Sequence, residues 1–213
     1  MRWVSTTATV LAGALLVGCA GKSVTVTVTT QSIARSPTRP PVKRPTRLPV
    51  NEYRVPSGSM EPTLGIGSHV TLQPGSPKVG EIAVFYPPEG AEEQVCGPQR
   101  HTVVLGAAAC SVPIPTESDV NFIKRIVAGP GDEIYVKEGH VYRNGLREQD
   151  SYIKECGPVP ECNFLTPIKI SAGHWFMMGD NRGESDDSRF YGPIPTSWIV
   201  GIVRGATPQG SSE

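Results

Sequence analysis

Two serines in the segment VPSGSMEPTL (55–64) are the first side chains in this sequence that could act as a nucleophile. A serine hydroxyl attacks a carbonyl carbon only when a neighbouring base takes its proton, and that base is usually a histidine. The sequence has four histidines, none of them in a recognisable triad motif: His69, His101, His140 and His174. His174 precedes Asp180 by a few residues, but a histidine in a strand is more often packed or solvated. The other solution is a Ser–Lys pair, which needs one buried lysine.

A candidate for that lysine lies in the segment FIKRIV (122–127), where Lys124 and Arg125 are adjacent. Side chains of a strand alternate between its two faces, so Lys124 shares a face with Phe122 and Ile126 and Arg125 takes the other face. One of the two cations should therefore point into apolar surroundings. Burial lowers the pKa of a lysine, and the neutral amine can then act as a general base. The alternative is an edge strand in which both charged groups reach water.

A third segment, GDNRGESDDSRFYG (179–192), is dense in polar side chains. It could be a surface loop or a calcium loop. The order of its acidic residues does not match the D-x-[DN]-x-[DN]-G pattern of a calcium loop. We therefore expect no metal and no cofactor, and expect the segment to position other groups.

The elements that must position these three segments are almost all strands. The 23 glycines and 21 prolines, with few aromatic residues, favour short strands and many turns. The strand-like segments are HVTLQ (69–73), EIAVFY (81–86), NFIKRIVAG (121–129), EIYVKEG (133–139), HVYRNGLRE (140–148), HWFMMGD (174–180) and SWIVGIVRG (197–205). The sequence GPGD (129–132) fits a type II turn, and Asn144–Gly145 fits a hairpin turn. The sequence predicts a mostly β, antiparallel domain with few or no helices outside the N-terminal leader.

Together, three segments resemble the hallmark motifs of one family. PSGSMEPTL (56–64), KRIVAGPGD (124–132) and GDNRGESDDSR (179–189) are similar, in this order, to motifs of the bacterial type I signal peptidases. These are membrane-bound Ser–Lys peptidases that remove signal peptides from exported preproteins. The resemblance covers about residues 52–205. It implies an antiparallel β-sheet domain of the signal-peptidase type.

The resemblance also implies roles for individual residues. Ser59 matches the nucleophile and Lys124 the general base. Ser57 matches the residue whose hydroxyl joins the Ser59 backbone N–H in the oxyanion hole, where the charge of the tetrahedral intermediate is stabilised. Ser185 matches a serine that hydrogen-bonds the lysine amine and orients it.

Further residues are assigned to the surroundings of this pair. Those expected to be structural polar residues beneath the site are Asp180, Arg182, Asp187 and Arg189. Those expected to line shallow apolar pockets, which accept small substrate residues at P1 and P3, are Val55, Pro56, Met60, Phe122 and Ile123. The chain departs from the family pattern at two turns, where Glu81 and Ser68 replace a usual Asp. We expect these departures to affect stability rather than chemistry.

The N-terminal region indicates export and attachment to a membrane. Residues 1–21 have a positive charge and then an apolar run, the layout of a secretory leader. The run ends in Leu16-Val17-Gly18-Cys19, which resembles a lipobox in which Cys19 would be lipidated. The alternative is an uncleaved membrane anchor, for which the run is short. Family members commonly carry transmembrane helices instead, so the mode of anchoring is open.

Charge and composition divide the rest of the chain. The first 50 residues hold seven Lys or Arg and no Asp or Glu. Residues 51–213 hold all 20 acidic residues and 13 basic ones, so their net charge is about −7. A basic extended segment before an acidic domain suggests a tether near an anionic surface and not a nucleic-acid reader. We expect a Pro/Arg-rich linker at 22–51, a peptidase domain at 52–207 and a flexible tail at 208–213.

Four further cysteines are an even number in an exported chain, which indicates disulfides: Cys96, Cys110, Cys156 and Cys162. Of the three possible connectivities we favour the sequence-local pairs Cys96–Cys110 and Cys156–Cys162. A zinc site that uses His101 is the alternative, but its spacing fits no familiar metal pattern.

The resulting expectation is a Ser–Lys endopeptidase on the extracytoplasmic face of the cytoplasmic membrane. Its partners would be exported preproteins with Ala-X-Ala cleavage sites and the lipids of that membrane, with no nucleic acid. The alternatives are a dedicated maturation peptidase of the same class, of the pilin or conjugation type, and a catalytically silent lipoprotein scaffold. Self-cleaving repressors, which are related to the family, are disfavoured because the chain has an exported leader and no DNA-binding domain.

Overall fold

The computed structural model describes residues 52–103, 106, 108–156 and 159–208. The leader (1–21), the linker (22–51), the lipobox cysteine Cys19 and most of the tail lie outside the described residues. Within them, no helix is long and apolar enough to cross a membrane.

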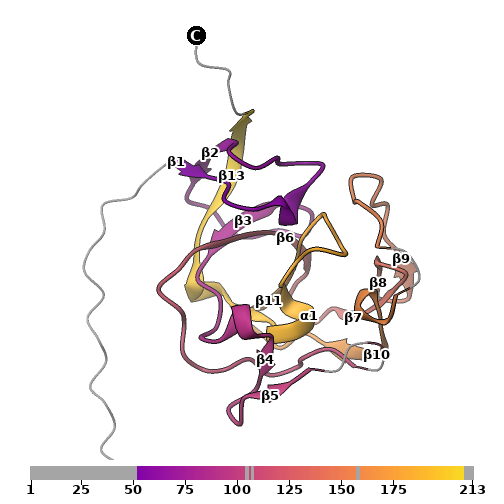
Figure 1. The fold of residues 1–213 in the computed structure, drawn as a ribbon. Coiled ribbons are helices and arrows are strands. Elements are labelled where there is room, and N and C mark those ends of the chain that lie inside the picture. The colour runs from indigo at the N-terminus through magenta and orange to yellow at the C-terminus, as the bar shows by residue number, and fades with distance from the viewer. Residues whose placement is uncertain (1–51, 104–105, 107, 157–158, 209–213) are drawn as a thin grey trace, which may run out of the picture. The chain divides into compact units, whose positions relative to one another are not determined.

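Seven strands form the main sheet, and each pairs antiparallel with its neighbours (Figure 1). In spatial order they are β1 (Glu52–Arg54), β2 (His69–Gln73), β13 (Ile199–Thr207), β3 (Ile82–Phe85), β6 (Phe122–Ala128), β11 (His174–Met178) and β12 (Ile194–Pro195). The last strand in sequence, β13, lies between β2 and β3, so the C-terminal strand of the domain pairs with two of its N-terminal strands. The strand that carries Lys124, β6, lies inside this sheet and is not an edge strand.

Two smaller sheets complete the fold. A four-stranded sheet has the order β10 (Phe164–Lys169), β7 (Glu133–Lys137), β8 (His140–Arg143) and β9 (Leu146–Arg147), and the hairpin of β4 (Val95–Cys96) and β5 (His101–Thr102) is the third sheet. The only α-helix among the described residues is the four-residue α1 (Ser188–Tyr191). Short 3₁₀ turns are η1 (Gly58–Met60), η2 (Ala91–Glu93), η3 (Pro160–Cys162) and η4 (Thr196–Trp198). The prediction of a mostly β, antiparallel domain is confirmed.

Local sequence accounts for most of these elements. Asn144 and Gly145 both have positive φ, 54° and 81°, as the tight hairpin between β8 and β9 requires. Gly131 has a φ of 88° in the predicted type II turn after β6. The sequence analysis missed β10, whose Pro167 cannot donate to a ladder. β10 tolerates it because it is an edge strand with an irregular register between Phe164 and Ile168.

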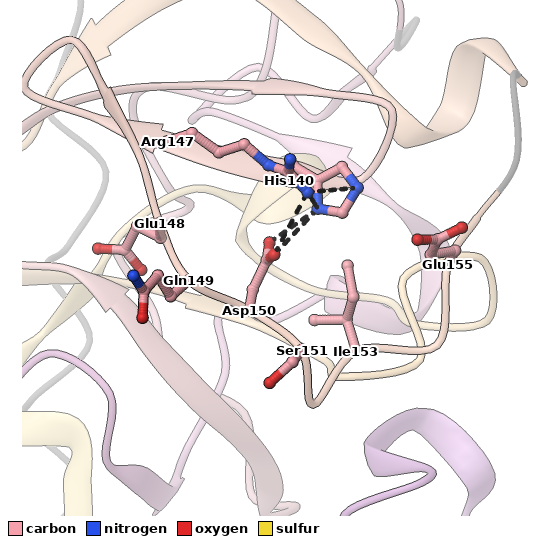
Figure 2. Close-up of a pocket in the computed structure, with 8 residues that line it drawn as sticks. All are labelled: His140, Arg147, Glu148, Gln149, Asp150, Ser151, Ile153 and Glu155. Atoms are coloured by element: carbon pink, nitrogen blue, oxygen red, sulfur yellow. Dashed lines mark hydrogen bonds and ion pairs between the residues drawn. The ribbon is translucent and has the colours of Figure 1, made fainter.

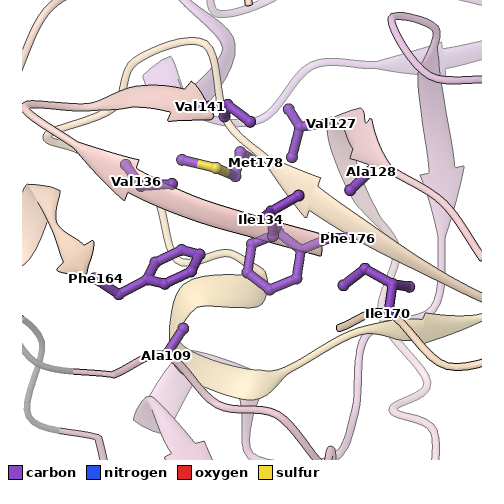
Figure 3. Close-up of a cluster of buried hydrophobic side chains, with 10 residues drawn as sticks. All are labelled: Ala109, Val127, Ala128, Ile134, Val136, Val141, Phe164, Ile170, Phe176 and Met178. Atoms are coloured by element: carbon purple, nitrogen blue, oxygen red, sulfur yellow. The ribbon is translucent and has the colours of Figure 1, made fainter. Parts of the chain in front are cut away.

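Apolar side chains gather in three clusters, and β6 contributes to all three. One cluster joins β6 and β11 to the four-stranded sheet (Figure 3); its buried members are Ala109, Val127, Ala128, Ile134, Val136, Val141, Phe164, Ile170, Phe176 and Met178. A second contains Ile126 with Ala83, Phe85 and Tyr191. A third contains Ile123 with Val55, Met60 and Leu64. Because β6 is covered on both faces, a polar side chain along it is forced out of water.

Candidate active site

The segment that contains Ser59 is held by its apolar residues. Val55 exchanges backbone hydrogen bonds with the far end of the loop, its N–H donating to the Ser68 carbonyl and its carbonyl accepting from Gly67, both at 2.8 Å. Val55, Met60 and Leu64 are buried in the third cluster. The single 3₁₀ turn η1 therefore sits on a fixed apolar base and carries Ser59 to the side of β6.

Ser59 and Lys124, 65 residues apart in sequence, meet at this place. The Lys124 amine donates a hydrogen bond to Ser59 Oγ at 2.7 Å. Lys124 is only 5% exposed and Ser59 only 7% exposed. Burial lowers the pKa of Lys124 to about 8, partly offset by Asp187, Asp186 and Asp180. A nucleophile and a base of suitable pKa are thus within proton-transfer distance.

Arg125, the neighbouring cation, has a different environment. Its Nε and Nη2 donate to the two carboxylate oxygens of Asp180 at 2.8 and 2.6 Å, and its guanidinium lies 4.0 Å from the centre of the Tyr152 ring. Thr63 Oγ1 also donates to Asp180, at 2.5 Å. Of the two adjacent cations, Arg125 is therefore neutralised by a partner, whereas Lys124 is held among apolar groups beside the serine.

Asn181 connects the polar segment 179–192 directly to η1. Its backbone N–H donates to the Ser59 carbonyl at 3.1 Å, and its Nδ2 donates to the Gly58 carbonyl, also at 3.1 Å. The sequence analysis did not single out Asn181. The only signal was its place within the third motif, because an amide that clamps a loop 123 residues away leaves no local pattern.

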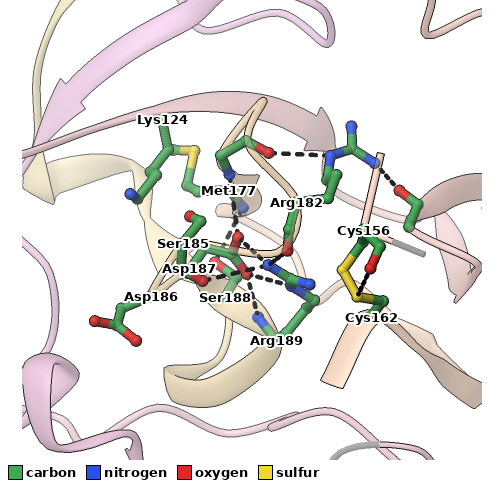
Figure 4. A network of polar contacts seen from close by, with 12 residues as sticks. Lys124, Cys156, Cys162, Met177, Arg182, Ser185, Asp186, Asp187, Ser188 and Arg189 are labelled. Atoms are coloured by element: carbon green, nitrogen blue, oxygen red, sulfur yellow. Dashed lines mark hydrogen bonds and ion pairs between the residues drawn. A yellow bond between two sulfur atoms is a disulfide. The ribbon is translucent and has the colours of Figure 1, made fainter. Parts of the chain in front are cut away.

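Asp187 and Arg189 fix the course of the segment beneath the site (Figure 4). Asp187 caps α1 by accepting from the Arg189 backbone N–H at 3.2 Å, and it accepts from Gly179 N–H at 3.1 Å. Arg189 Nε and Nη2 donate to its two oxygens at 2.8 and 2.9 Å. Burial opposes ionisation of Asp187, but the Arg189 guanidinium holds its pKa below the usual value.

Arg182 ties the same segment to the four-stranded sheet. It is 1% exposed and donates from Nε to the Gly179 carbonyl at 3.0 Å and from Nη1 to the Gly139 carbonyl. The Asp150 carboxylate lies 4.0 Å from Nη1. The four residues expected to be structural are all buried: Asp180, Arg182, Asp187 and Arg189.

The structure places the two accessory serines differently. Ser57 Oγ donates to Ser59 Oγ at 3.3 Å and is exposed, beside the nucleophile candidate. Ser185 is buried, but its hydroxyl has no hydrogen-bond partner among the described residues, so the expected bond to Lys124 is not formed here. Its Cβ and Oγ nevertheless lie close to Gly179, which the Ser59 carbonyl oxygen also approaches.

The residues expected to line the substrate pockets divide between two clusters. Val55, Met60 and Ile123 share the third cluster next to Ser59, and Pro56 is exposed at its rim. Phe122 packs instead in the second cluster, 6.1 Å between ring centres from Tyr191. The Lys124 amine lies 5.6 Å from the centre of the Phe122 ring, so this ring covers the base.

The structure joins the cysteines in the sequence-local pattern, Cys96 to Cys110 and Cys156 to Cys162. The first bridge staples the connection between β3 and β6, and the second lies against Gly183 in the third motif. The described residues include no cluster of three or more His, Cys, Asp or Glu able to hold a metal ion.

A polar cavity of about 510 Å³ lies beside β8 and β9 (Figure 2). It is lined by His140, Arg147, Glu148, Gln149, Asp150, Ser151, Ile153 and Glu155. His140 Nδ1 lies 3.0 Å from both oxygens of the nearly buried Asp150, and Arg147 lies over the imidazole ring. Neither Ser59 nor Lys124 lines this cavity. The imidazole–carboxylate pair is therefore separate from the Ser59–Lys124 pair.

Comparison with known proteins identifies the family of this chain. The model of the family described as signal peptidase, peptidase S26, matches residues 46–206. A probable signal peptidase I-1 of Synechocystis is 37% identical over 152 residues, which cover 69% of this chain and 65% of that protein. The thylakoidal processing peptidase 1 of Arabidopsis thaliana is 32% identical over 153 residues, covering 69% and 38%. A signal peptidase I structure from Enterococcus faecalis aligns with a TM-score of 0.37 at 16% identity, covering 62% of this chain and all of that one, too low a likeness to add to the fold described above.

The fold and the family match together define the class: the chain belongs to the signal peptidase family, peptidase S26. Its curated relatives include signal peptidases I, which confirms the resemblance drawn from the three motifs. The chain matches 65% of the length of the first of these relatives and 58% of the second.

Proposed function

We propose that this chain is a membrane-associated serine endopeptidase that removes N-terminal signal peptides from exported preproteins, with Ser59 as nucleophile and Lys124 as general base. The observation that carries the proposal is the 2.7 Å contact between Ser59 Oγ and the buried Lys124 amine. Membership of the signal peptidase family supports the substrate class. With a pKa of about 8, roughly a tenth of the lysine is neutral at pH 7 and most of it is neutral at pH 9.

In the proposed reaction the neutral Lys124 amine takes the proton of Ser59 as Oγ attacks the scissile carbonyl carbon. The resulting oxyanion accepts hydrogen bonds from the Ser59 backbone N–H and from Ser57 Oγ, which lies 3.3 Å from Ser59 Oγ. The Lys124 ammonium then protonates the leaving amine as the peptide bond breaks. A water that loses its proton to the same amine hydrolyses the acyl-enzyme and regenerates Ser59.

The remaining residues serve this dyad. We assign Val55, Pro56, Met60, Phe122 and Ile123 to shallow pockets that prefer small residues at P1 and P3. Ser185 would orient the lysine once its hydroxyl turns toward the amine, and its burial without another partner leaves it available to do so. Cys19 would carry a lipid, or residues 1–21 an anchor, that holds the domain (52–207) on the extracytoplasmic face of the cytoplasmic membrane through the linker (22–51), with residues 208–213 as a tail.

The decisive test is cleavage of a preprotein with an Ala-X-Ala site by the full-length chain, followed from pH 6 to pH 10. The parent protein should gain activity through an apparent pKa near 8, and Ser59→Ala and Lys124→Ala should each retain less than a few percent. Thr166→Ala, an exposed change in β10, is the matched control and should keep full activity. Full activity of Ser59→Ala would refute the nucleophile.

The same assay separates the two alternatives. A silent scaffold would cleave nothing at any pH, although its fold would be intact. A dedicated maturation peptidase would cleave few members of a panel of Ala-X-Ala preproteins, whereas a general signal peptidase would cleave most of them.

A further inference from the structure

The connection between β3 and β6 reaches the site from outside the three motifs. Its base is closed by two backbone hydrogen bonds of 2.8 Å, from Glu89 N–H to the Thr116 carbonyl and from Ser118 N–H to the Pro87 carbonyl. Cys96 and Cys110 cross-link it. We call residues 86–121 the stapled insertion. Because it leads directly into β6, a displacement of its end would move the backbone close to Lys124.

Hydrogen bonds from described residues of the stapled insertion reach the segment beneath the dyad. Gln94 Nε2 donates to Asp186 Oδ1 at 2.5 Å, and the Cys110 backbone N–H donates to the Arg189 carbonyl at 3.0 Å. The first joins two side chains that are 92 residues apart and only partly buried. A hydrogen bond to a carboxylate is among the stronger hydrogen bonds of a protein, and it fixes where the carboxylate lies.

The backbone of Gln94 is itself unfavourable. It has φ 54° and ψ 38°, in the left-handed region, at the end of η2. A side chain other than Gly or Asn rarely adopts this conformation, and such positions cluster where the surrounding structure fixes a group for a purpose. Here the conformation directs the amide to Asp186.

Asp186 is a charge that acts on the base. The charged side chains that act on the Lys124 amine all come from the segment beneath it: Asp180, Asp186, Asp187 and Arg189. The other neighbours are uncharged, since η1 offers Ser59, β3 offers Ala83 opposite Lys124, and β11 offers Met177. Asp180 is occupied by Arg125, and Asp187 by Arg189. Asp186 differs from these two acids in that it accepts from the neutral Gln94 amide and from no arginine in the described residues.

We propose that Gln94 is a positioning residue for the Lys124 base: its amide holds the Asp186 carboxylate on the side of the stapled insertion, so that the carboxylate does not pair with the lysine amine. Among the ion pairs of the described residues, none joins Asp186 to Lys124. A carboxylate released next to a buried ammonium moves toward it and stabilises its charged form. This inference rests on the proposed function, because it assumes that neutral Lys124 is the active base.

The test is the pH dependence of kcat/KM for full-length variants with an Ala-X-Ala preprotein. Gln94→Gly removes the amide and relieves the left-handed backbone, so it should fold at least as well as the parent. Its acid midpoint should rise by about half to one pH unit, which lowers kcat/KM at pH 7 roughly three- to tenfold and leaves it unchanged at pH 9.5. The matched control is Asn144→Gly, which also removes an amide side chain at positive φ but lies in the turn between β8 and β9. It should not shift the midpoint.

The double variant decides whether Gln94 acts through Asp186. Asp186→Asn should lower the midpoint because it removes a negative charge near the amine. Adding Gln94→Gly to Asp186→Asn should then cause no further shift. An unshifted or lowered midpoint in Gln94→Gly, or an equal shift in both backgrounds, would overturn the proposal.

A titration of the Lys124 amine by NMR, in chains labelled with ¹³C at the lysine side chains, keeps the two proposals apart. It is performed in the Ser59→Ala background, where no catalysis is needed, and the Lys124 signal is assigned by its absence from Lys124→Ala. A midpoint that moves with Gln94→Gly, while the parent protein with Ser59 intact cleaves no preprotein, would support the positioning role and count against the peptidase. An active enzyme whose lysine titration ignores Gln94→Gly would count against the positioning role alone.

Discussion

Gly179 lies so close to Ser59 that a Cβ at position 179 would overlap the Ser59 carbonyl oxygen. The same Cβ would meet the Cβ of Ser185 at 2.6 Å. Since the Ser59 carbonyl also accepts from the Asn181 N–H, the third motif contacts η1 through its backbone. Only a residue without a side chain permits this approach.

Gly179→Ala should therefore displace η1 and Ser59 relative to Lys124. Misplacement of a reacting group by about 1 Å costs about 100-fold in rate, so we expect kcat/KM to fall by about that factor. The control is Gly205→Ala in β13, where the nearest atom to an added Cβ is the Thr71 hydroxyl at 3.8 Å. Steady-state kinetics of both variants checks the prediction, and parent-like activity of Gly179→Ala would contradict it.

Replacing Lys124 by Met should stabilise the fold at neutral pH while abolishing activity. The pKa of Lys124 is lowered from 10.5 to about 8 in the folded state by burial. A lowered lysine pKa costs stability fully below pH 8, and the cost fades as the pH rises from 8 toward 10.5. We expect Lys124→Met to gain about 3 kcal/mol in the free energy of unfolding at pH 6 and little at pH 10.5. Urea unfolding at the two pH values measures this gain. An equal gain at both would show that burial does not disfavour the charged form of Lys124.

Removing Arg125 should destabilise the fold far more than removing an exposed arginine. Asp180 is fully buried and Arg125 neutralises it through two hydrogen bonds. Arg125→Met would leave that carboxylate unpaired, which costs about 3–5 kcal/mol. Arg100→Met, whose ion pair with Glu93 is exposed, should cost less than about 1 kcal/mol. Denaturant unfolding compares them, and Asp180→Asn added to Arg125→Met should recover part of the loss.

The two disulfides should contribute unequally. Their sequence separations are 14 for Cys96–Cys110 and 6 for Cys156–Cys162. Loop-closure entropy gives about 3 kcal/mol for the longer loop and about 2 kcal/mol for the shorter. Non-reducing peptide mapping establishes the pairing, and paired Cys→Ser variants then give the two losses in thermal unfolding. Crossed bridges in the peptide map would refute the sequence-local connectivity.

Much of the candidate site could be predicted from the sequence. The three motifs were enough to recognise the family. The alternation in FIKRIV predicted that one of the two cations, Lys124 or Arg125, points into apolar surroundings. Strand alternation and turn chemistry are local properties, so β6, β11 and the Asn144–Gly145 hairpin followed from short stretches of chain. β10 was not predicted because it contains Pro167. A proline is tolerated in an edge strand, and the position of a strand in the sheet is not visible in the local sequence.

The tertiary structure decided which groups meet. Alternation alone cannot tell whether Lys124 or Arg125 is the unpaired cation, because that depends on Asp180, 55 residues further along, reaching one of them and not the other. The tertiary structure also placed Phe122 over the Lys124 amine, left the Ser185 hydroxyl without a hydrogen-bond partner among the described residues, and brought Gln94 to Asp186. Burial and charge at a given side chain are set by elements distant in sequence, whereas residue type and spacing are set within a motif. The sequence by itself therefore determined which chemistry is possible, and the packing around β6 determined which side chains are placed to perform it.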